Sequence, residues 1–138
     1  MNTRDDVHTL LSARPKRLGH ATFLDEDAQR IVLEHKICLE VCITSNLLCK
    51  TVKTLEDHPI NFWLNHDVPI VICVCSILQK CPPILTPNSQ TDDTLPFRND
   101  IIGEYAMLLA TPPLGLGLSN QAAERLAQMS MDARFPQP

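Results

Sequence analysis

Two kinds of apolar pattern alternate along this chain, and the alternation limits the folds that it can adopt. The stretch at 17–24 is typical of a short strand that ends in a loop. The runs at 37–44 and 68–73 have the length and composition of strands and are apolar on both alternating faces apart from Glu40. Strands of this kind are typical of a parallel sheet that is buried on both sides. Because parallel strands need crossover connections, the sequence predicts an α/β fold.

Helical spacing fills the intervals between these runs. Asp25 can cap a helix whose buried side is Ala28, Ile31 and Val32 and whose last turn holds His35 and Lys36. Other helices are expected at 7–13, near 60–65, at 99–110 and, capped by Ser119, at 120–129, with a Pro/Gly connector at 111–117 and a frayed tail at 130–138.

Composition and charge exclude several classes of function. A formal net charge of −4 without a basic stripe argues against a polynucleotide partner. No run approaches the roughly 18 apolar residues of a transmembrane helix, and the first six residues do not resemble a signal peptide. We therefore expect a soluble cytoplasmic protein with a small-molecule partner and no membrane partner, whose six cysteines are reduced rather than paired in disulfides.

Polar side chains follow each predicted strand. Gly19 and His20 come after the first, Thr44-Ser45-Asn46 after the second, and Asp92-Asp93 beyond the third. Taken singly, a lone histidine is more often structural and an Asp-Asp pair is more often a solvated turn. Together they match the active-site rim that parallel strands of a barrel build at their carboxyl ends.

The segments RLGHATFL (17–24), ICLEVCITSNLLCKTV (37–52) and TDD (91–93) resemble three consecutive signatures of the adenosine deaminase family. Thr44-Ser45-Asn46 followed by Thr51-Val52 is more similar to the N6-methyl-AMP deaminase branch than to adenosine deaminase proper. The resemblance implies a (β/α)8 TIM barrel, of which residues 1–138 would form an incomplete C-terminal portion of about three βα units.

The resemblance also implies a chemistry and roles for individual residues. Family members hold one zinc ion (Zn2+), and metal-bound water attacks carbon 6 of adenosine, AMP or N6-methyl-AMP and expels ammonia or an alkylamine. By this match His20 orients or deprotonates the attacking water, Asp92 is a metal ligand, and Asp93 binds a purine ring nitrogen. An imidazole that titrates near neutrality and a hard carboxylate suit those roles.

Four further residues are expected to bind substrate. Thr44, Ser45 and Asn46 stand after the penultimate strand of the implied barrel, where such enzymes often bind phosphate, and Gly19 is grouped with them. The alternative is that the three side chains cap their own loop.

The chain departs from the family pattern in two ways. It has no His-x-His or His-x-x-Glu motif, so we expect it neither to hold zinc nor to turn over by itself. His35, His58 and His66 are expected on the surface and do not replace the absent ligands. Residues 74–90 separate the third strand from TDD, and we interpret them as a non-family insertion translated from a retained intron.

Two other functions are left open by the sequence. In the first, a partial barrel with exposed strand edges is a non-catalytic module that binds a partner or associates with itself. In the second, weaker one, cysteines form a zinc-binding module, for which the candidates are Cys73, Cys75 and Cys81, with Cys38 and Cys42 as additional ligands.

Overall fold

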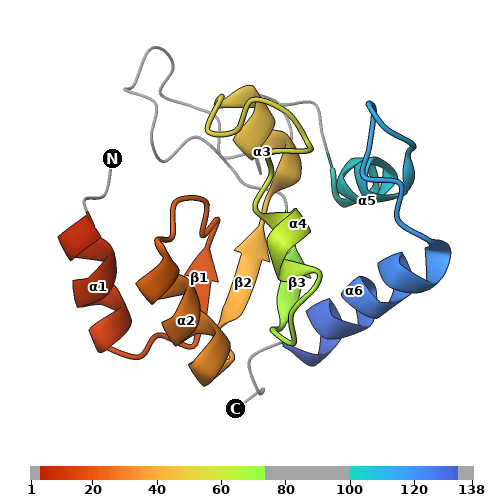
Figure 1. The fold of residues 1–138 in the computed structure, drawn as a ribbon. Coiled ribbons are helices and arrows are strands. Elements are labelled where there is room, and N and C mark those ends of the chain that lie inside the picture. Colours follow the sequence, from red (N-terminus) through yellow and green to blue (C-terminus); the bar gives the residue numbers. More distant parts are fainter. Residues whose placement is uncertain (1–3, 74–99, 134–138) are drawn as a thin grey trace, which may run out of the picture.

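The computed structural model describes residues 4–73 and 100–133, and within them it confirms the predicted α/β class. Three parallel strands form one sheet in the order β1-β2-β3 (Figure 1), namely β1 (Arg17–Gly19), β2 (Cys38–Val41) and β3 (Ile70–Ile72). Leu18, Leu39 and Ile70 are in register across the sheet. All three carboxyl ends therefore lie at one edge.

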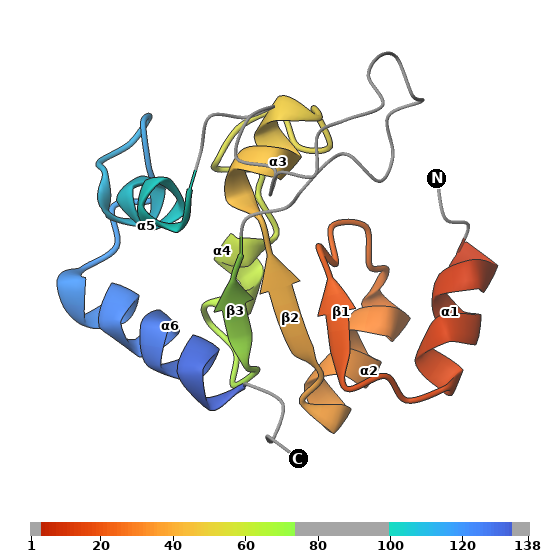
Figure 2. The same cartoon turned by 180° about the vertical axis from the view of Figure 1, so that it is seen from behind.

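Six helices surround this sheet in the described residues. They are α1 (Arg4–Ser12), α2 (Glu26–His35), α3 (Ile43–Leu48), α4 (Ile60–Trp63), α5 (Ile101–Leu109) and α6 (Asn120–Asp132). In Figure 1 α2 and α4 lie in front of the strands, and in the reverse view of Figure 2 the strands lie in front of them. The two helices thus cover the same face of the sheet, and α3 stands above the end of β2.

Strand alternation explains how each face of the sheet is used. Leu39 and Val41 point toward the helices, while the intervening Glu40 points to the opposite face, where its carboxylate lies 2.6 Å from Arg17 Nε. Ile70 and Ile72 repeat the helix-facing pattern one strand away. The hydrophobic core therefore lies between the sheet and its helices.

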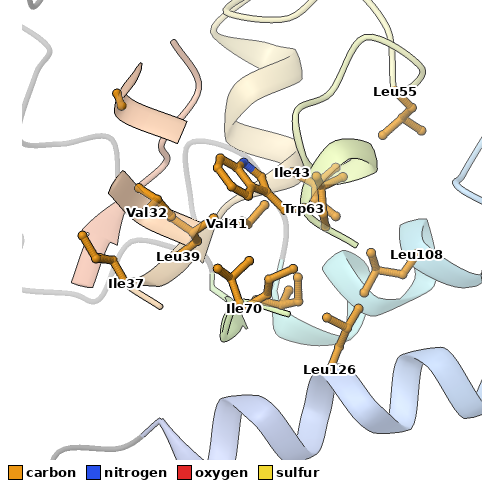
Figure 3. Packing of buried hydrophobic residues seen from close by; sticks show 14 of the residues in the cluster. Val32, Ile37, Leu39, Val41, Ile43, Leu55, Trp63, Ile70, Leu108 and Leu126 are labelled. Carbon is orange, nitrogen blue, oxygen red and sulfur yellow. The ribbon is translucent and has the colours of Figure 1, made fainter. Parts of the chain in front are cut away.

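The core draws apolar side chains from nearly every element, as Figure 3 shows. Its buried members include Val32, Leu39, Val41, Ile43, Ile60, Trp63, Ile70, Leu108 and Leu126. Burial of each such side chain stabilises the fold by roughly 1.5–3 kcal/mol relative to exposure. Because Leu108 and Leu126 belong to α5 and α6, this packing holds the C-terminal helices against the sheet.

Side-chain caps begin three of the helices. Asp25 accepts a hydrogen bond from the Ala28 N–H at 2.8 Å, and Ser119 accepts one from the Ala122 N–H at 3.2 Å, so both predicted caps are confirmed. Asp100 caps α5 in the same way. The last predicted helix continues to Asp132, into the segment expected to fray.

The second predicted strand is shorter than expected. The run 37–44 was expected to remain extended, but β2 ends at Val41 and α3 begins at Ile43. Thr44, Ser45 and Asn46 are consequently helical instead of forming a loop after the strand. The apolar and β-branched residues of ICLEVCIT favour a strand locally, but tertiary contacts to the backbone N–H groups at Ile43 and Thr44 favour the helix.

Several expectations concern residues outside the described ranges. Residues 74–90, Asp92, Asp93, Cys75 and Cys81 all lie there, so the structure describes neither the insertion nor the carboxylate pair. Within the described residues, none of the helices has the length and apolarity needed to cross a membrane.

Candidate active site

The carboxyl edge of the sheet carries the described part of the candidate site. His20 follows β1 directly, α3 starts two residues after Val41 of β2, and Cys73 follows β3. In Figure 1 the ends of β1 and β2 point toward the end of the molecule that α3 occupies. Two of the three predicted polar clusters are thereby placed at neighbouring strand ends.

His20 has an unusual backbone conformation. Its φ is 62° and that of Ala21 is 47°, although neither residue is glycine. The left-handed region costs an L-residue roughly 1–2 kcal/mol, and such residues cluster at functional sites. The His20 N–H donates to the Glu40 carbonyl at 2.7 Å, so β2 holds this turn in place. The turn ends β1 at Gly19, which is exposed.

A hydrogen-bonded row of side chains runs from His20 into the interior. The amide group of Asn46 lies 3.0 Å from His20 Nδ1 and 3.0 Å from His58 Nε2. At the far end, the Ile60 N–H donates to His58 Nδ1 at 3.1 Å. Asn46 and His58 are 2% and 1% exposed, so the inner part of the row is shielded from water, whereas His20 is half-buried.

The expectation that His58 lies on the surface is wrong. Burial, and secondarily the positive charge of protonated His20, lower the pKa of His58 from its ordinary value of 6.5 to about 4. The side chain is buried because its two ring nitrogens bond to Asn46 and to the Ile60 backbone, contacts that a histidine before proline does not reveal in sequence. His35 and His66 are exposed, as predicted.

Glu104 of α5 is a buried acid that the sequence did not reveal as part of this region. Its carboxylate accepts hydrogen bonds from the Ile43 N–H at 2.8 Å and from the Thr44 N–H at 3.2 Å. With 1% exposure it satisfies the otherwise unpaired first amides of α3. The start of α3 is thus fixed by a residue from a distant helix.

The residues expected to bind substrate have different surroundings. Asn46 contacts two histidines, Ser45 is 5% exposed, and the Thr44 hydroxyl donates to Met107 Sδ at 3.2 Å. Thr44 is half-buried and Gly19 is exposed. The loop-capping alternative does not describe these side chains, since they lie in a helix.

Two thiols lie beside this edge of the sheet. Cys42 Sγ and Cys73 Sγ are 2.9 Å apart, and the hydrogen bond from Cys42 lowers the pKa of Cys73. Among the described residues Cys38, Cys49 and Cys73 are not in disulfides. Cys49 is exposed, whereas Cys38 is buried, which raises its pKa.

The described side chains do not form a metal centre by themselves. In residues 4–73 and 100–133 there is no group of three or more His, Cys, Asp or Glu side chains arranged to hold a metal ion. Since a catalytic zinc needs about three protein ligands, these residues alone do not fit the ion.

Comparison with known proteins identifies the family. The model of the adenosine deaminase family matches residues 5–76, which is more than half of the chain. The chain belongs to the adenosine deaminase family. Relatives include the N6-Methyl-AMP deaminase of Danio rerio, 30% identical over 97% of this chain and 34% of its own length. Another is the N6-Methyl-AMP deaminase of Bos taurus, 37% identical over 80% of this chain and 28% of its own.

Solved structures agree with this assignment at the level of fold. The N6-mAMP deaminase of Arabidopsis superposes with a TM-score of 0.78 at 24% identity, over 99% of this chain and 35% of that chain. A structure described as an ADAL-IMP complex gives 0.77 at 25% identity, over 99% and 34%. This chain therefore spans about a third of the length of its relatives. Its three-stranded sheet matches part of their barrel.

Proposed function

We propose that this chain contributes the C-terminal part of the catalytic centre of a purine deaminase, with His20 acting on the attacking water. The observation that carries the proposal is the position of His20, which stands at a strand end in a left-handed conformation and is bonded to a buried Asn46. An active-site rim at the carboxyl ends of parallel strands is the arrangement that barrel enzymes use. Membership of the deaminase family supports the reaction class.

The proposed substrate is a purine nucleotide, AMP or N6-methyl-AMP, with adenosine as the competing nucleoside. Two of the relatives are named N6-Methyl-AMP deaminase, and an Arabidopsis relative has been solved with GMP and another structure with IMP. In the proposed reaction one water adds its oxygen to carbon 6 of the purine. The carbon–nitrogen bond then breaks, and ammonia or methylamine leaves with one proton of the water while the other stays on a ring nitrogen of the product, inosine or IMP.

The candidate site residues have different proposed tasks in that reaction. His20 orients or deprotonates the water, Asp93 binds a ring nitrogen of the purine, and Gly19 and Thr44 contact the sugar-phosphate side. The burial of Ser45 and Asn46 favours a supporting place beneath that surface. Asp92 is the proposed zinc ligand, and a bound zinc would lower the pKa of its water to about 7. The other ligands must come from outside the described residues.

A segment exchange tests the proposal. In the Danio rerio N6-Methyl-AMP deaminase, the segment that aligns with this chain is replaced by the sequence of this chain. Two exchanged proteins are made, one with residues 74–90 and one without them. We expect zinc binding and turnover of AMP or N6-methyl-AMP only without residues 74–90, and loss of at least 100-fold in kcat when His20→Ala is added, as for a lost acid-base group.

The controls separate a folding failure from a functional one. Zinc content and circular dichroism report whether each exchanged protein is assembled, and His66→Ala is a matched surface variant that should keep full activity. An assembled, zinc-loaded protein that releases neither ammonia nor methylamine would overturn the proposed reaction. Equal activity of His20→Ala would overturn the role of His20.

A further inference from the structure

The buried Asn46 and His58 reach His20, but neither is assigned a contact with substrate or water in the proposed reaction. Their hydrogen bonds nevertheless determine where protons can lie along the row. A neutral imidazole has one N–H donor and one nitrogen acceptor, whereas an amide has an oxygen that accepts and an NH2 that donates. The positions of the protons can therefore be followed from the buried end outward.

The first step fixes the tautomer of His58. The Ile60 backbone N–H can only donate, and it points to His58 Nδ1 at 3.1 Å, so Nδ1 is an acceptor. His58 is 1% exposed and its pKa is lowered to about 4, so the ring is neutral at physiological pH. A neutral ring with an unprotonated Nδ1 must carry its proton on Nε2.

The second step fixes the orientation of the Asn46 amide. In the structure the Asn46 Oδ1 atom lies 3.0 Å from His20 Nδ1 and the Nδ2 atom 3.0 Å from His58 Nε2. Which end of an amide is oxygen is assigned from its hydrogen-bond partners, and a half-turn of the side chain exchanges the two atoms. Because His58 Nε2 donates, the atom that faces it must be the Asn46 oxygen, so the amide is turned by half a turn from the orientation in the structure. The NH2 group then faces His20 Nδ1 and donates to it, so His20 Nδ1 is also an acceptor.

We propose that Asn46 and His58 are positioning residues that hold His20 as the tautomer with its proton on Nε2. A nitrogen that carries its proton donates a hydrogen bond and accepts none. Insofar as the proposed function is correct, His20 then acts on the attacking water as a hydrogen-bond donor that orients it, and not as the base that deprotonates it. His20 could either orient the attacking water or deprotonate it, and the hydrogen bonds from Asn46 and His58 favour orientation.

The experiment is a nuclear magnetic resonance measurement on the 138-residue chain with 15N-labelled histidine. Long-range 1H–15N correlations distinguish protonated from unprotonated ring nitrogens, and the pH is set above the ordinary histidine pKa of about 6.5. We expect His20 and His58 both to show a protonated Nε2 and an unprotonated Nδ1. A His20 ring protonated on Nδ1 in the unsubstituted chain overturns the proposal, whatever the variants do.

Two substitutions test the cause of the tautomer. Asn46→Asp replaces the amide with a carboxylate that only accepts, so His20 should change to the tautomer with its proton on Nδ1. His58→Gln keeps a donor toward Asn46 and should preserve the His20 tautomer, whereas His58→Leu removes the donor and should leave His20 with a mixture of both. An unchanged His20 ring in Asn46→Asp would contradict the proposal.

The readout also separates this inference from the proposed function. The exposed His66 follows α4 by three residues, and His66→Gln serves to assign the spectrum and should leave His20 unaffected. A merely structural role for Asn46 would change stability but not the protonated nitrogen of His20. The predicted tautomer in the chain, together with an assembled, zinc-loaded exchanged protein that has no deaminase activity, would refute the function alone. Deaminase activity of the exchanged protein, together with a His20 ring protonated on Nδ1 in the chain, would refute the tautomer alone.

Discussion

A histidine that is buried in its neutral form couples stability to pH. The pKa of His58 is about 4 in the folded chain and 6.5 when the ring is exposed, so between these values the unfolded chain binds a proton that the folded chain does not. Stability is therefore fully present above pH 6.5 and decreases as the pH falls toward 4. The shift corresponds to a loss of about 3 kcal/mol across that window.

We predict that His58→Gln removes most of this dependence. Urea unfolding at a series of pH values between 6.5 and 4 measures it, because glutamine has no proton to gain in that window. Asp25 and Asp67 titrate lower, since a hydrogen bond from the Ala28 N–H and one from Lys36, respectively, lower their pKa values. His66→Gln is the exposed control. If both variants lost the same amount of the pH dependence of stability, His58 would not be its source.

Of the three residues in this hydrogen-bonded row, local sequence predicts some and not others. His20 could be predicted because a Gly-His pair followed a strand pattern and lay within a recognisable segment. His58 could not, since its burial depends on Asn46 from a different element, and the sequence around it has the composition of a surface loop. Asn46 was found, but as a substrate-binding candidate whose observed partners are two histidines.

At the scale of elements, Glu104 connects α5 to the start of α3. Its carboxylate accepts from two backbone amides, and the Ile43 N–H is in the interior, where an unpaired donor is costly. We predict that Glu104→Ala lowers the free energy of unfolding by about 3 kcal/mol, because it removes a charged acceptor and leaves these amides unsatisfied. Chemical denaturation measures the difference.

Two companion variants make this prediction specific. Glu104→Gln keeps one acceptor oxygen and should cost less than Glu104→Ala, whereas Glu124→Ala, on the exposed side of α6, should be within about 0.5 kcal/mol of the unsubstituted chain. Equal losses for Glu104→Ala and Glu124→Ala would show that the buried carboxylate does not support α3.

The elements differ in how far local sequence determines them. The second helix could be predicted with its cap, because Asp25 and the spacing of Ala28 and Val32 are all local signals. The end of β2 could not be predicted, because it depends on the start of α3. The first amides of α3 bond to Glu104, which lies about 60 residues further along the chain. Likewise, β1 ends where His20 and Ala21 turn left-handed, a conformation that no residue type there announces.

At the scale of the whole molecule, the described sheet has two edges. β1 and β3 each pair only with β2 among the residues described, and Figure 2 shows a helix, not a strand, beyond β1. Closure of a barrel is the arrangement that removes such edges. The sequence predicted both the partial barrel and the possibility of self-association, and the sheet order gives that second expectation a physical basis.

We predict that the isolated chain associates in a concentration-dependent way through these edges. Unpaired backbone N–H and C=O groups at a strand edge can pair with another chain, and a short sheet gains stability from added strands. Sedimentation velocity over a wide range of concentrations should show a rising average mass. The exchanged protein with the Danio rerio segments supplies neighbouring strands and should stay at one mass over the same range. A constant mass of one chain for both proteins would show that the edges β1 and β3 are already protected, and association could then no longer account for the non-catalytic alternative.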